Sequence, residues 1–345
     1  MQKFLNDPLD FVDEALEGIL RAHPADLRRV SARGLIRADA PLPRKVGLVT
    51  GGGFGHLPLF LGYVGDGLAD GVAVGNVFAS PGAIDIAAVG RAVSAGHGVL
   101  FLIGNYFGDV ANFRKAAELL AAEGIPADVV TVTDDVASAP PDARERRRGI
   151  AGAFFVYKIA GAAAAAGLSL EEVGRLARRA NAATHTIGVA LSPCEIPGTG
   201  RPSFTLPAGE MEIGMGIHGE AGIERGPLRP AREVAALLVE RLAADGALDA
   251  PEVAVLLNSL GATSPEELYV LYGAVHEALA SHGTRVAYAL VGRYATSMEM
   301  AGCSLSVLRL EEAFRPLLER PAYSPLLQAI RLRPLPAAGS GGGGA

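Results

Sequence analysis

Short runs of β-branched residues alternate with longer stretches rich in alanine and leucine along most of this 345-residue chain. Alternating strands and helices build sheets whose faces are covered by helices, so the pattern predicts an α/β fold. We expect strands at 45–50, 71–78, 98–104, 127–133, 252–260 and 285–292. We expect helices at 81–95, 110–124, 150–166, 170–185, 230–244 and 264–282.

The character of the sequence changes near residues 185–190, where a stretch rich in proline and glycine begins. The chain is longer than most single domains, and half of its residues are apolar, which is enough for two cores. We therefore predict two domains, 1–187 and 188–336, each a mixed β-sheet covered by helices. The low-complexity residues 337–345 are predicted to form a flexible tail rich in glycine and serine.

Charge argues against some classes of partner. The formal net charge is −6, and the only basic run, at 144–149, is short, so we expect neither nucleic-acid binding nor membrane binding. The apolar stretch at 151–170 contains Lys158 and is a poor membrane span. The first residues do not resemble a signal peptide, which predicts a cytoplasmic location.

The chain has two cysteines and lacks both the C-x-x-C and the H-E-x-x-H spacing, which predicts no metal site.

A glycine-rich loop, "LVTGGGFGHLPLF", occupies residues 48–60. It lacks the lysine and following serine or threonine of a P-loop, and His56 stands where the Rossmann pattern needs its third glycine. What remains is a flexible backbone and an ionisable ring after a predicted strand, where open α/β sheets bind ligands. The loop alone leaves a ligand site and a plain glycine turn equally open.

Two further ionisable residues stand in suggestive contexts. Asp109 follows a predicted strand and precedes a helix; it could cap that helix, which the sequence alone favours, or accept a proton from a hydroxyl. His218 ends an alternating, strand-like stretch and has glycine neighbours, with Glu220 close by. A single histidine is more often a core residue, but small neighbours leave the ring accessible.

Taken together, these stretches resemble the dihydroxyacetone kinase family, specifically its K subunit or K domain. The resemblance covers nearly the whole chain and includes several long motifs in order. They are the glycine loop, "GNVFASP" (75–81), "NYFGDVANF" (105–113), "GVALSPCEIPGTGRPSF" (188–204), "EMEIGMGIHGE" (210–220) and "LVGRYATSMEMAGCSLSVLRL" (290–310).

The resemblance implies an unusual phosphoryl transfer to a small ketose. The residue matching the family's covalent histidine is His218, whose ring nitrogen would add to the ketone carbonyl and form a hemiaminal. Asp109 would take the proton of the attacking hydroxyl, and His56 would hydrogen-bond the substrate. The substrate-binding positions implied are Gly52, Gly53, Phe54, Gly55, Ser80 and Gly104, with Gly53 approaching the sugar.

The resemblance also implies what the chain would need from elsewhere. In this family the nucleotide and magnesium sit in a separate all-helical L domain or L subunit, so we expect no cofactor bound by this chain. The expected partner is an L subunit carrying ATP, or carrying ADP that a phosphotransferase relay recharges. A homodimer is expected on the same ground.

Four positions depart from the family pattern and leave two functions open. Phe54, Leu57 and Phe107 replace polar residues, and Gly104 replaces a lysine. The two phenylalanines and the leucine should exclude water from the pocket and shift the acceptor away from dihydroxyacetone; the alternative is neutral drift on the outer wall of the pocket. The first function is a ketose kinase subunit, favoured by the retained Asp109. The second is a non-catalytic ketose sensor or coactivator, which the missing lysine favours more weakly.

Overall fold

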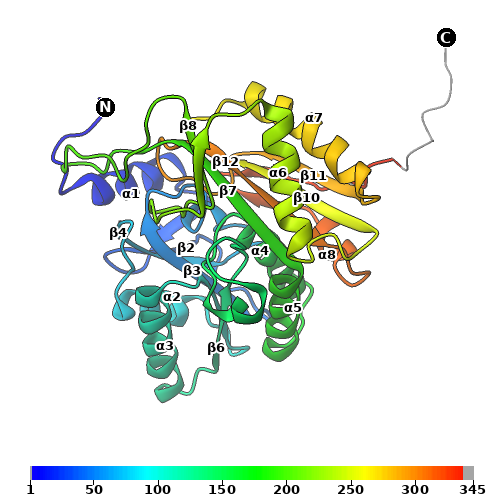
Figure 1. The fold of residues 1–345 in the computed structure, drawn as a ribbon. Helices are drawn as coiled ribbons and strands as arrows, with labels where there is room; N and C mark the ends of the chain where they lie inside the picture. Colours follow the sequence, from blue (N-terminus) through cyan, green and yellow to red (C-terminus); the bar gives the residue numbers. More distant parts are fainter. Residues whose placement is uncertain (1, 337–345) are drawn as a thin grey trace, which may run out of the picture.

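Two six-stranded sheets with helices on their faces make up the molecule (Figure 1). The computed structural model describes residues 2–336, so the predicted tail at 337–345 lies outside the described residues. The predicted α/β class with two helix-covered sheets is confirmed. No helix in the described part of the chain is both long and apolar enough to cross a membrane.

The first sheet runs in the order β1-β2-β4-β3-β5-β6. Strands β4, β3, β5 and β6 are parallel, and β1 and β2 add an antiparallel edge. Helices α2 and α3 cover one face, where Val89 and Phe113 share an apolar cluster with Phe101 of β5. The elements are α1 (Phe11–Ala22), β1 (Leu27–Arg29), β2 (Gly34–Arg37), β3 (Gly47–Phe54), β4 (Gly71–Val77), α2 (Ala83–Val93), β5 (Val99–Gly104), α3 (Phe107–Ala122) and β6 (Ala127–Val132).

The second sheet runs in the order β11-β10-β12-β7-β8-β9 and is mixed, since only β10 and β11 pair in parallel. Helices α6 and α7 cover its outer face, where Leu238 and Val275 pack over Val255 of β10. The elements are β7 (Thr184–Ser192), β8 (Glu210–Ile213), β9 (Glu224–Pro227), α6 (Ala231–Ala244), β10 (Glu252–Ser259), α7 (Pro265–Ser281), β11 (Arg285–Gly292) and β12 (Ala301–Arg309). A short helix, α8 (Arg315–Glu319), and the hairpin of β13 (Ala322–Ser324) and β14 (Gln328–Ile330) follow.

Helices α4 (Ala153–Ala165) and α5 (Leu170–Ala183) lie between the two sheets (Figure 1). Residues 153–164 of α4 are all buried, and even Lys158 is held inside, donating its amine to the Leu317 carbonyl at 2.7 Å. One apolar cluster contains Leu100 of the first sheet, Phe155 of α4 and Leu256 of the second sheet. The two sheets therefore share a core, which fixes how their loops meet.

The periodicity located every strand and helix it predicted, within a few residues. Two details differ. The strand β7 begins at Thr184, where the preceding helix was expected to continue, and the strand expected up to His218 ends at Ile213 as β8. His218 therefore lies in a turn, a position that leaves its ring free to reach another part of the molecule.

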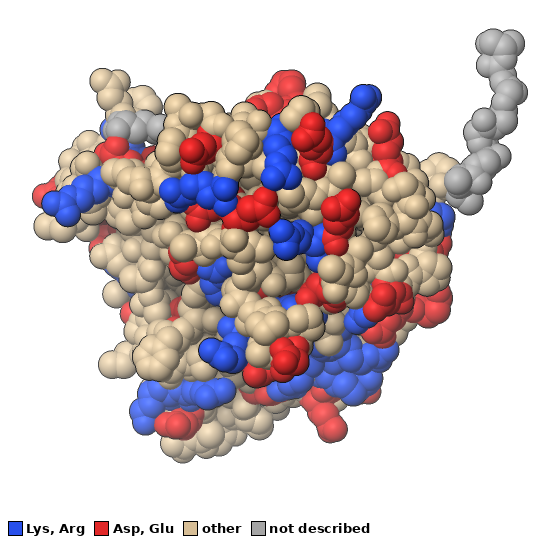
Figure 2. All heavy atoms as spheres, viewed as in Figure 1, with Lys and Arg blue, Asp and Glu red and all other residues tan. Residues whose placement is uncertain are grey.

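The visible surface carries acidic and basic side chains that are interspersed, with a group of basic side chains over α5 (Figure 2). This helix carries Arg175, Arg178 and Arg179. Arg178 binds Asp128, and Arg179 pairs with Glu311. Two of the three arginines of α5 are thus neutralised within the chain.

Candidate active site

The ends of parallel strands bring three of the predicted site residues to one edge of the first sheet. His56 follows β3, Ser80 follows β4, and Asp109 lies in the first turn of α3, directly after β5. Strand β3 pairs in parallel with both β4 and β5, so the three carboxyl ends are neighbours. This edge is where α/β sheets bind ligands.

His218 reaches the same place from the second sheet. Its imidazole lies 4.8 Å from the ring of His56, 4.7 Å from Tyr106 and 5.6 Å from Phe78, measured between ring centroids. All three contacts are edge-on. The structure therefore brings together the residues that the sequence placed more than 100 positions apart, and aromatic rings fix the orientation of His218.

His56 is buried, and its hydrogen bond defines its tautomer. Nδ1 lies 2.8 Å from the Thr296 carbonyl, which can only accept, so Nδ1 donates and Nε2 keeps its lone pair. Burial, reinforced by the nearby His218, lowers the pKa of His56 to about 3. The ring is thus neutral at physiological pH, and its buried Nε2 has no partner among the described residues.

Glu220 defines the tautomer of His218 in the same way. The carboxylate Oε1 accepts from His218 Nδ1 at 3.0 Å, and Oε2 accepts from the backbone N–H of His218 at 3.0 Å. Burial alone would raise the pKa of Glu220, but the hydrogen bond and charge of His218 outweigh it and lower the pKa to about 2. With Nδ1 engaged as a donor, Nε2 is the nitrogen of His218 that keeps its lone pair.

Asp109 is, with His56, one of the two buried ionisable groups of the site. Burial raises its pKa to about 6, opposed by a hydrogen bond with Ser80 and by the charge of His218. Its Oδ1 atom is buried and has no partner in the described chain. The Ser80 hydroxyl is in turn held by the Asn112 amide at 3.3 Å. The N-cap of α3 is Tyr106, so Asp109 is not the cap that the sequence alone favoured.

The glycines of the loop are required by packing inside the chain. A Cβ on Gly52 would clash with the Phe60 ring, and one on Gly53 would lie 2.6 Å from the backbone of Phe78. Gly55 has a φ of +111°, which favours glycine. A cavity of only about 10 Å³ lies within the loop. Packing against Phe60 and Phe78 therefore requires glycine at positions 52 and 53 of the loop that leads to His56.

The altered family positions do not form one apolar pocket wall. Phe107 was expected to exclude water from the site, but its side chain is 92% exposed, so that expectation is wrong. Phe54, expected to bind substrate, packs its ring against Phe11 of α1 with centroids 5.7 Å apart. Gly104 is next to the site: a Cβ there would lie 2.9 Å from the Tyr106 ring, which contacts His218.

Sequence reasoning missed the residues that hold these groups in place. Thr296 accepts from His56 through its carbonyl, and its hydroxyl donates to the Leu57 carbonyl at 2.8 Å. Tyr106 packs on His218 and donates its hydroxyl to Gly149 at 3.1 Å. Both residues lie inside the motifs that carry the family resemblance, which was the only signal for them. Within the described residues, no cluster of three or more histidine, cysteine or acidic side chains could hold a metal.

Comparison with known sequences supports the resemblance. The Dak1 domain model matches residues 17–326. A D-erythrulose kinase of Mycolicibacterium smegmatis is 47% identical over 94% of this chain and 56% of the relative. The dihydroxyacetone-binding subunit of PTS-dependent dihydroxyacetone kinase 1 of Listeria innocua is 44% identical over 90% of this chain and 95% of its own length. The chain thus spans about half the length of the erythrulose kinase it matches, and nearly all of the binding subunit.

Solved structures agree with the sequences. The dihydroxyacetone kinase of C. freundii superimposes with a TM-score of 0.87 at 30% identity, covering 100% of this chain and 64% of that one. A dihydroxyacetone kinase operon co-activator superimposes with a TM-score of 0.84 at 31% identity, covering 90% of this chain and 96% of its own. The match of fold, motifs and sequence over most of its length shows that this chain belongs to the dihydroxyacetone kinase family, as a K subunit or K domain with a Dak1 fold.

Proposed function

We propose that this chain binds a small ketose covalently on His218 and presents a terminal hydroxyl of that ketose to Asp109 for phosphorylation. The observation that carries the proposal is the pair of buried, unpartnered atoms beside His218, namely Nε2 of His56 and Oδ1 of Asp109. Buried polar atoms in proteins nearly always have partners, so two such acceptors in one place suit the hydroxyls of a polyol. Carbon-13 NMR of carbonyl-labelled dihydroxyacetone or erythrulose tests it: the ketone signal should move to a hemiaminal shift.

The covalent step creates charge on the imidazole of His218, and a neighbouring carboxylate can stabilise that charge. The lone pair of His218 Nε2 forms a bond to the carbonyl carbon while the C=O π electrons move to oxygen, which takes a proton from solvent. The imidazole gains positive charge, and Glu220, already accepting from Nδ1, stabilises that charge at 3.0 Å. A small polyol offers little contact area, so this tether would supply the orientation that weak contacts cannot.

The transfer step uses Asp109 and His56. Asp109 would accept the proton of the terminal hydroxyl as its oxygen attacks phosphorus, since this reaction depends mainly on positioning and on removal of that proton. His56 Nε2 would accept a hydrogen bond from a second hydroxyl and so orient the chain of the sugar. The nucleotide with its magnesium would be supplied by a partner.

The pH dependence of transfer should report the ionisation of Asp109. Because its pKa is raised to about 6, the carboxylate that can accept a proton prevails only above that pH. His56, with a pKa near 3, adds no step in this range. The rate of transfer should therefore rise about tenfold per pH unit below pH 6 and level off above it, measured as kcat between pH 4.5 and 8.5. A profile that is flat down to pH 4.5 would remove Asp109 as the base.

We propose a four-carbon ketose of the erythrulose type as the acceptor. The support comes from names of relatives: a D-erythrulose kinase at 47% identity and an L-erythrulose kinase of Pectobacterium atrosepticum at 43%, beside dihydroxyacetone-binding subunits at 44% and lower. Gly104 is consistent with a changed acceptor. The Tyr106 ring occupies the space into which a side chain at position 104 would extend, so the lysine of the family pattern is replaced there by an aromatic surface. Competition between labelled dihydroxyacetone and each erythrulose enantiomer for adduct formation ranks the three ketoses by their affinity for the chain.

The partner expected for the phosphoryl group is an L-type nucleotide-binding domain or subunit. Two large apolar side chains stand exposed on the first turns of helices next to the site: Phe107, two residues before Asp109 in α3, is 92% exposed, and Ile84 in α2 is 82% exposed. The two helix ends are joined, since Asn112 donates to the Pro81 carbonyl at 2.8 Å. Exposed apolar groups beside a site are typical of a docking surface.

Replacing Phe107 by serine should therefore weaken binding of an L-type partner by about tenfold or more, the loss typical of an aromatic anchor. Adduct formation should be unchanged, because the ring of Phe107 is outside the pocket. Calorimetric titration with an L-type protein measures the first quantity and carbon-13 NMR the second. Tyr269→Ser on α7, where the aromatic ring is 62% exposed, is the matched control. Equal partner affinity in both variants would place the docking surface elsewhere.

The alternative function is a ketose-binding coactivator without catalysis. The likeness to a dihydroxyacetone kinase operon co-activator, at 31% identity, keeps it open. A sensor needs the tether but no base, and the buried Asp109 with its free oxygen favours the kinase. Formation of the adduct without phosphoryl transfer in the presence of any L-type protein would favour the coactivator.

A further inference from the structure

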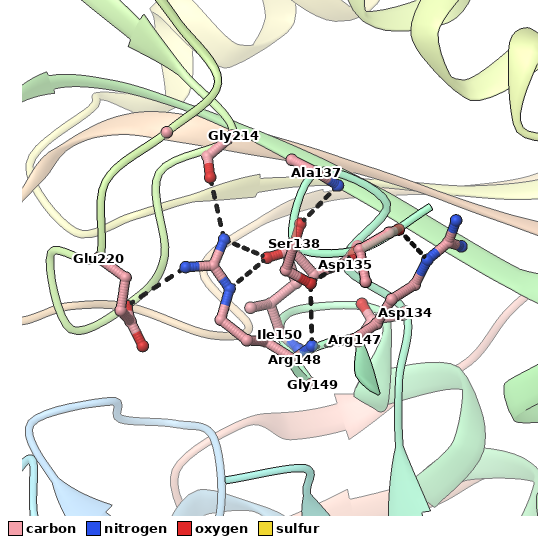
Figure 3. Close-up of polar contacts among 12 residues, drawn as sticks. Asp134, Asp135, Ala137, Ser138, Arg147, Arg148, Gly149, Ile150, Gly214 and Glu220 are labelled. Carbon is pink, nitrogen blue, oxygen red and sulfur yellow. Dashed lines mark hydrogen bonds and ion pairs between the residues drawn. The ribbon is translucent and has the colours of Figure 1, made fainter. Parts of the chain in front are cut away.

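Arg148 contacts both sides of the turn that carries His218 (Figure 3). Its Nη2 donates to the Gly214 carbonyl at 3.0 Å, and its Nη1 lies 3.8 Å from Oε2 of Glu220. Its Nε donates to Oδ2 of Asp135 at 2.8 Å. The guanidinium is mostly buried, with 15% of the side chain exposed, and it faces two carboxylates at once.

We propose that Arg148 is a positioning residue for the covalent histidine: it holds the 214–220 turn against the loop after β6 and keeps the Glu220 carboxylate where it accepts from His218 Nδ1. This inference rests on the function proposed above and adds a residue to which the family resemblance assigned no role. Arg148 touches no reacting atom, so it acts only through Glu220 and the turn.

The turn is built so that Glu220 and Arg148 can meet inside it. Gly214 has a φ of +78°, and the N–H of Gly216 donates to the Glu220 carbonyl at 3.0 Å. A Cβ on Gly216 would clash with the Glu220 carboxylate and lie 2.5 Å from Arg148 Nη1. Glycine at 216 therefore admits both charged groups, and the carboxylate closes the turn through the backbone N–H of His218.

Arg148 is itself anchored to the first-sheet side of the site. Its backbone N–H donates to Ser138 Oγ at 3.0 Å, and its carbonyl accepts from the Asp135 N–H at 3.1 Å. Asp135 is buried and pairs with Thr186 of β7 as an isolated bridge. The arginine thus links the loop after β6 to the turn after β8, and so sets His218 relative to His56 and Asp109.

Only a forked cation can make these contacts together. Arg148 binds Asp135 through Nε and Nη2, the Gly214 carbonyl through Nη2 and approaches Glu220 through Nη1. A lysine at 148 would keep the charge but could not reach all three groups in fixed geometry. A methionine would leave Asp135 and Glu220 without the cation that they share.

The test compares Arg148→Lys and Arg148→Met with the wild-type chain. Nitrogen-15 NMR of the imidazoles reads the tautomer of His218, and carbon-13 titration of labelled erythrulose reads the adduct. We expect the Nδ1–H tautomer in the wild type and a mixture of tautomers in both variants. The adduct dissociation constant should rise about tenfold in Arg148→Lys and about 100-fold in Arg148→Met, the loss typical of a displaced reacting group. Arg146→Met, at an exposed neighbouring arginine, should change neither readout.

The outcomes separate this inference from the proposed function. No adduct in the wild type contradicts the proposed function, and the tautomer still tests the positioning. A folded Arg148→Met chain with the wild-type tautomer and wild-type adduct constant overturns the role of Arg148. If Arg148→Met does not fold, the double variant Arg148→Met with Asp135→Asn removes the unpaired buried carboxylate, and the same two readouts apply.

Discussion

Replacing His218 by alanine should abolish the proposed ketone adduct, so that carbonyl-labelled erythrulose or dihydroxyacetone should keep its free-ketone carbon-13 signal at any protein concentration. In the proposed mechanism Nε2 of His218 forms the bond. His56 is a poor substitute, since its Nδ1 donates to Thr296 and burial lowers the basicity of its other nitrogen. Apparent ketone affinity should fall by at least about 100-fold once the tether is lost.

A matched control separates this loss from general damage. His276→Ala changes an exposed histidine on α7, away from the site, and should keep the wild-type adduct. The alanine at 218 lies in a turn, so the two variants should melt at similar temperatures. An adduct that persists in His218→Ala would mean that another residue, with His56 the first to examine, carries the covalent bond.

The fold could be read from the sequence wherever burial follows a simple period. Strands β3 and β5 are buried throughout, and β4 and β10 are buried except at one end, which the pattern of a doubly covered sheet predicts. Strand β12 was missed although it lies in the middle of the second sheet. Its Ser304 and Ser306 are buried and satisfied across strands, by Asn258 and Thr186, so the run does not look apolar.

The site was predictable only in part, for a related reason. His56, Asp109 and His218 stand in recognisable motifs, and the family resemblance named them. What orients them comes from distant segments: Thr296 lies 240 positions from His56, and Arg148 lies 66 positions from Gly214. Such contacts depend on how the two sheets pack on α4 and α5, and no local spacing encodes them. The prediction for Phe107 was wrong for the same reason. Whether its side chain faces a pocket or solvent depends on the packing of the fold and not on its sequence neighbours.

Replacing Asp109 by asparagine should spare the adduct and stop the transfer. The amide keeps the size of the carboxylate and can still bond to Ser80, but it cannot accept a proton from the attacking hydroxyl. We expect transfer to fall by about 100-fold to 10,000-fold, the usual contribution of a general base. The adduct constant should stay within about threefold, because His218 and Glu220 are unchanged. Single-turnover transfer with an L-type partner measures the first, and carbon-13 titration the second.

The thermal stability of Asp109→Asn shows whether the loss of transfer reflects the chemistry or an unfolded chain. Burial raises the folded pKa of Asp109 above its unfolded value near 3.8, so its stabilising contribution is present at low pH and is lost as pH rises from about 4 to 6. Above pH 6 the wild type therefore carries a buried charge that the asparagine variant lacks, and Asp109→Asn should melt no lower than wild type at pH 8. Asp85→Asn, the equivalent first-turn acid of α2, is the control and should transfer at the wild-type rate. A stable Asp109→Asn chain with undiminished transfer would point to His56, the other buried ionisable group that the described residues place beside His218, and the proposed roles of the two residues would have to be exchanged.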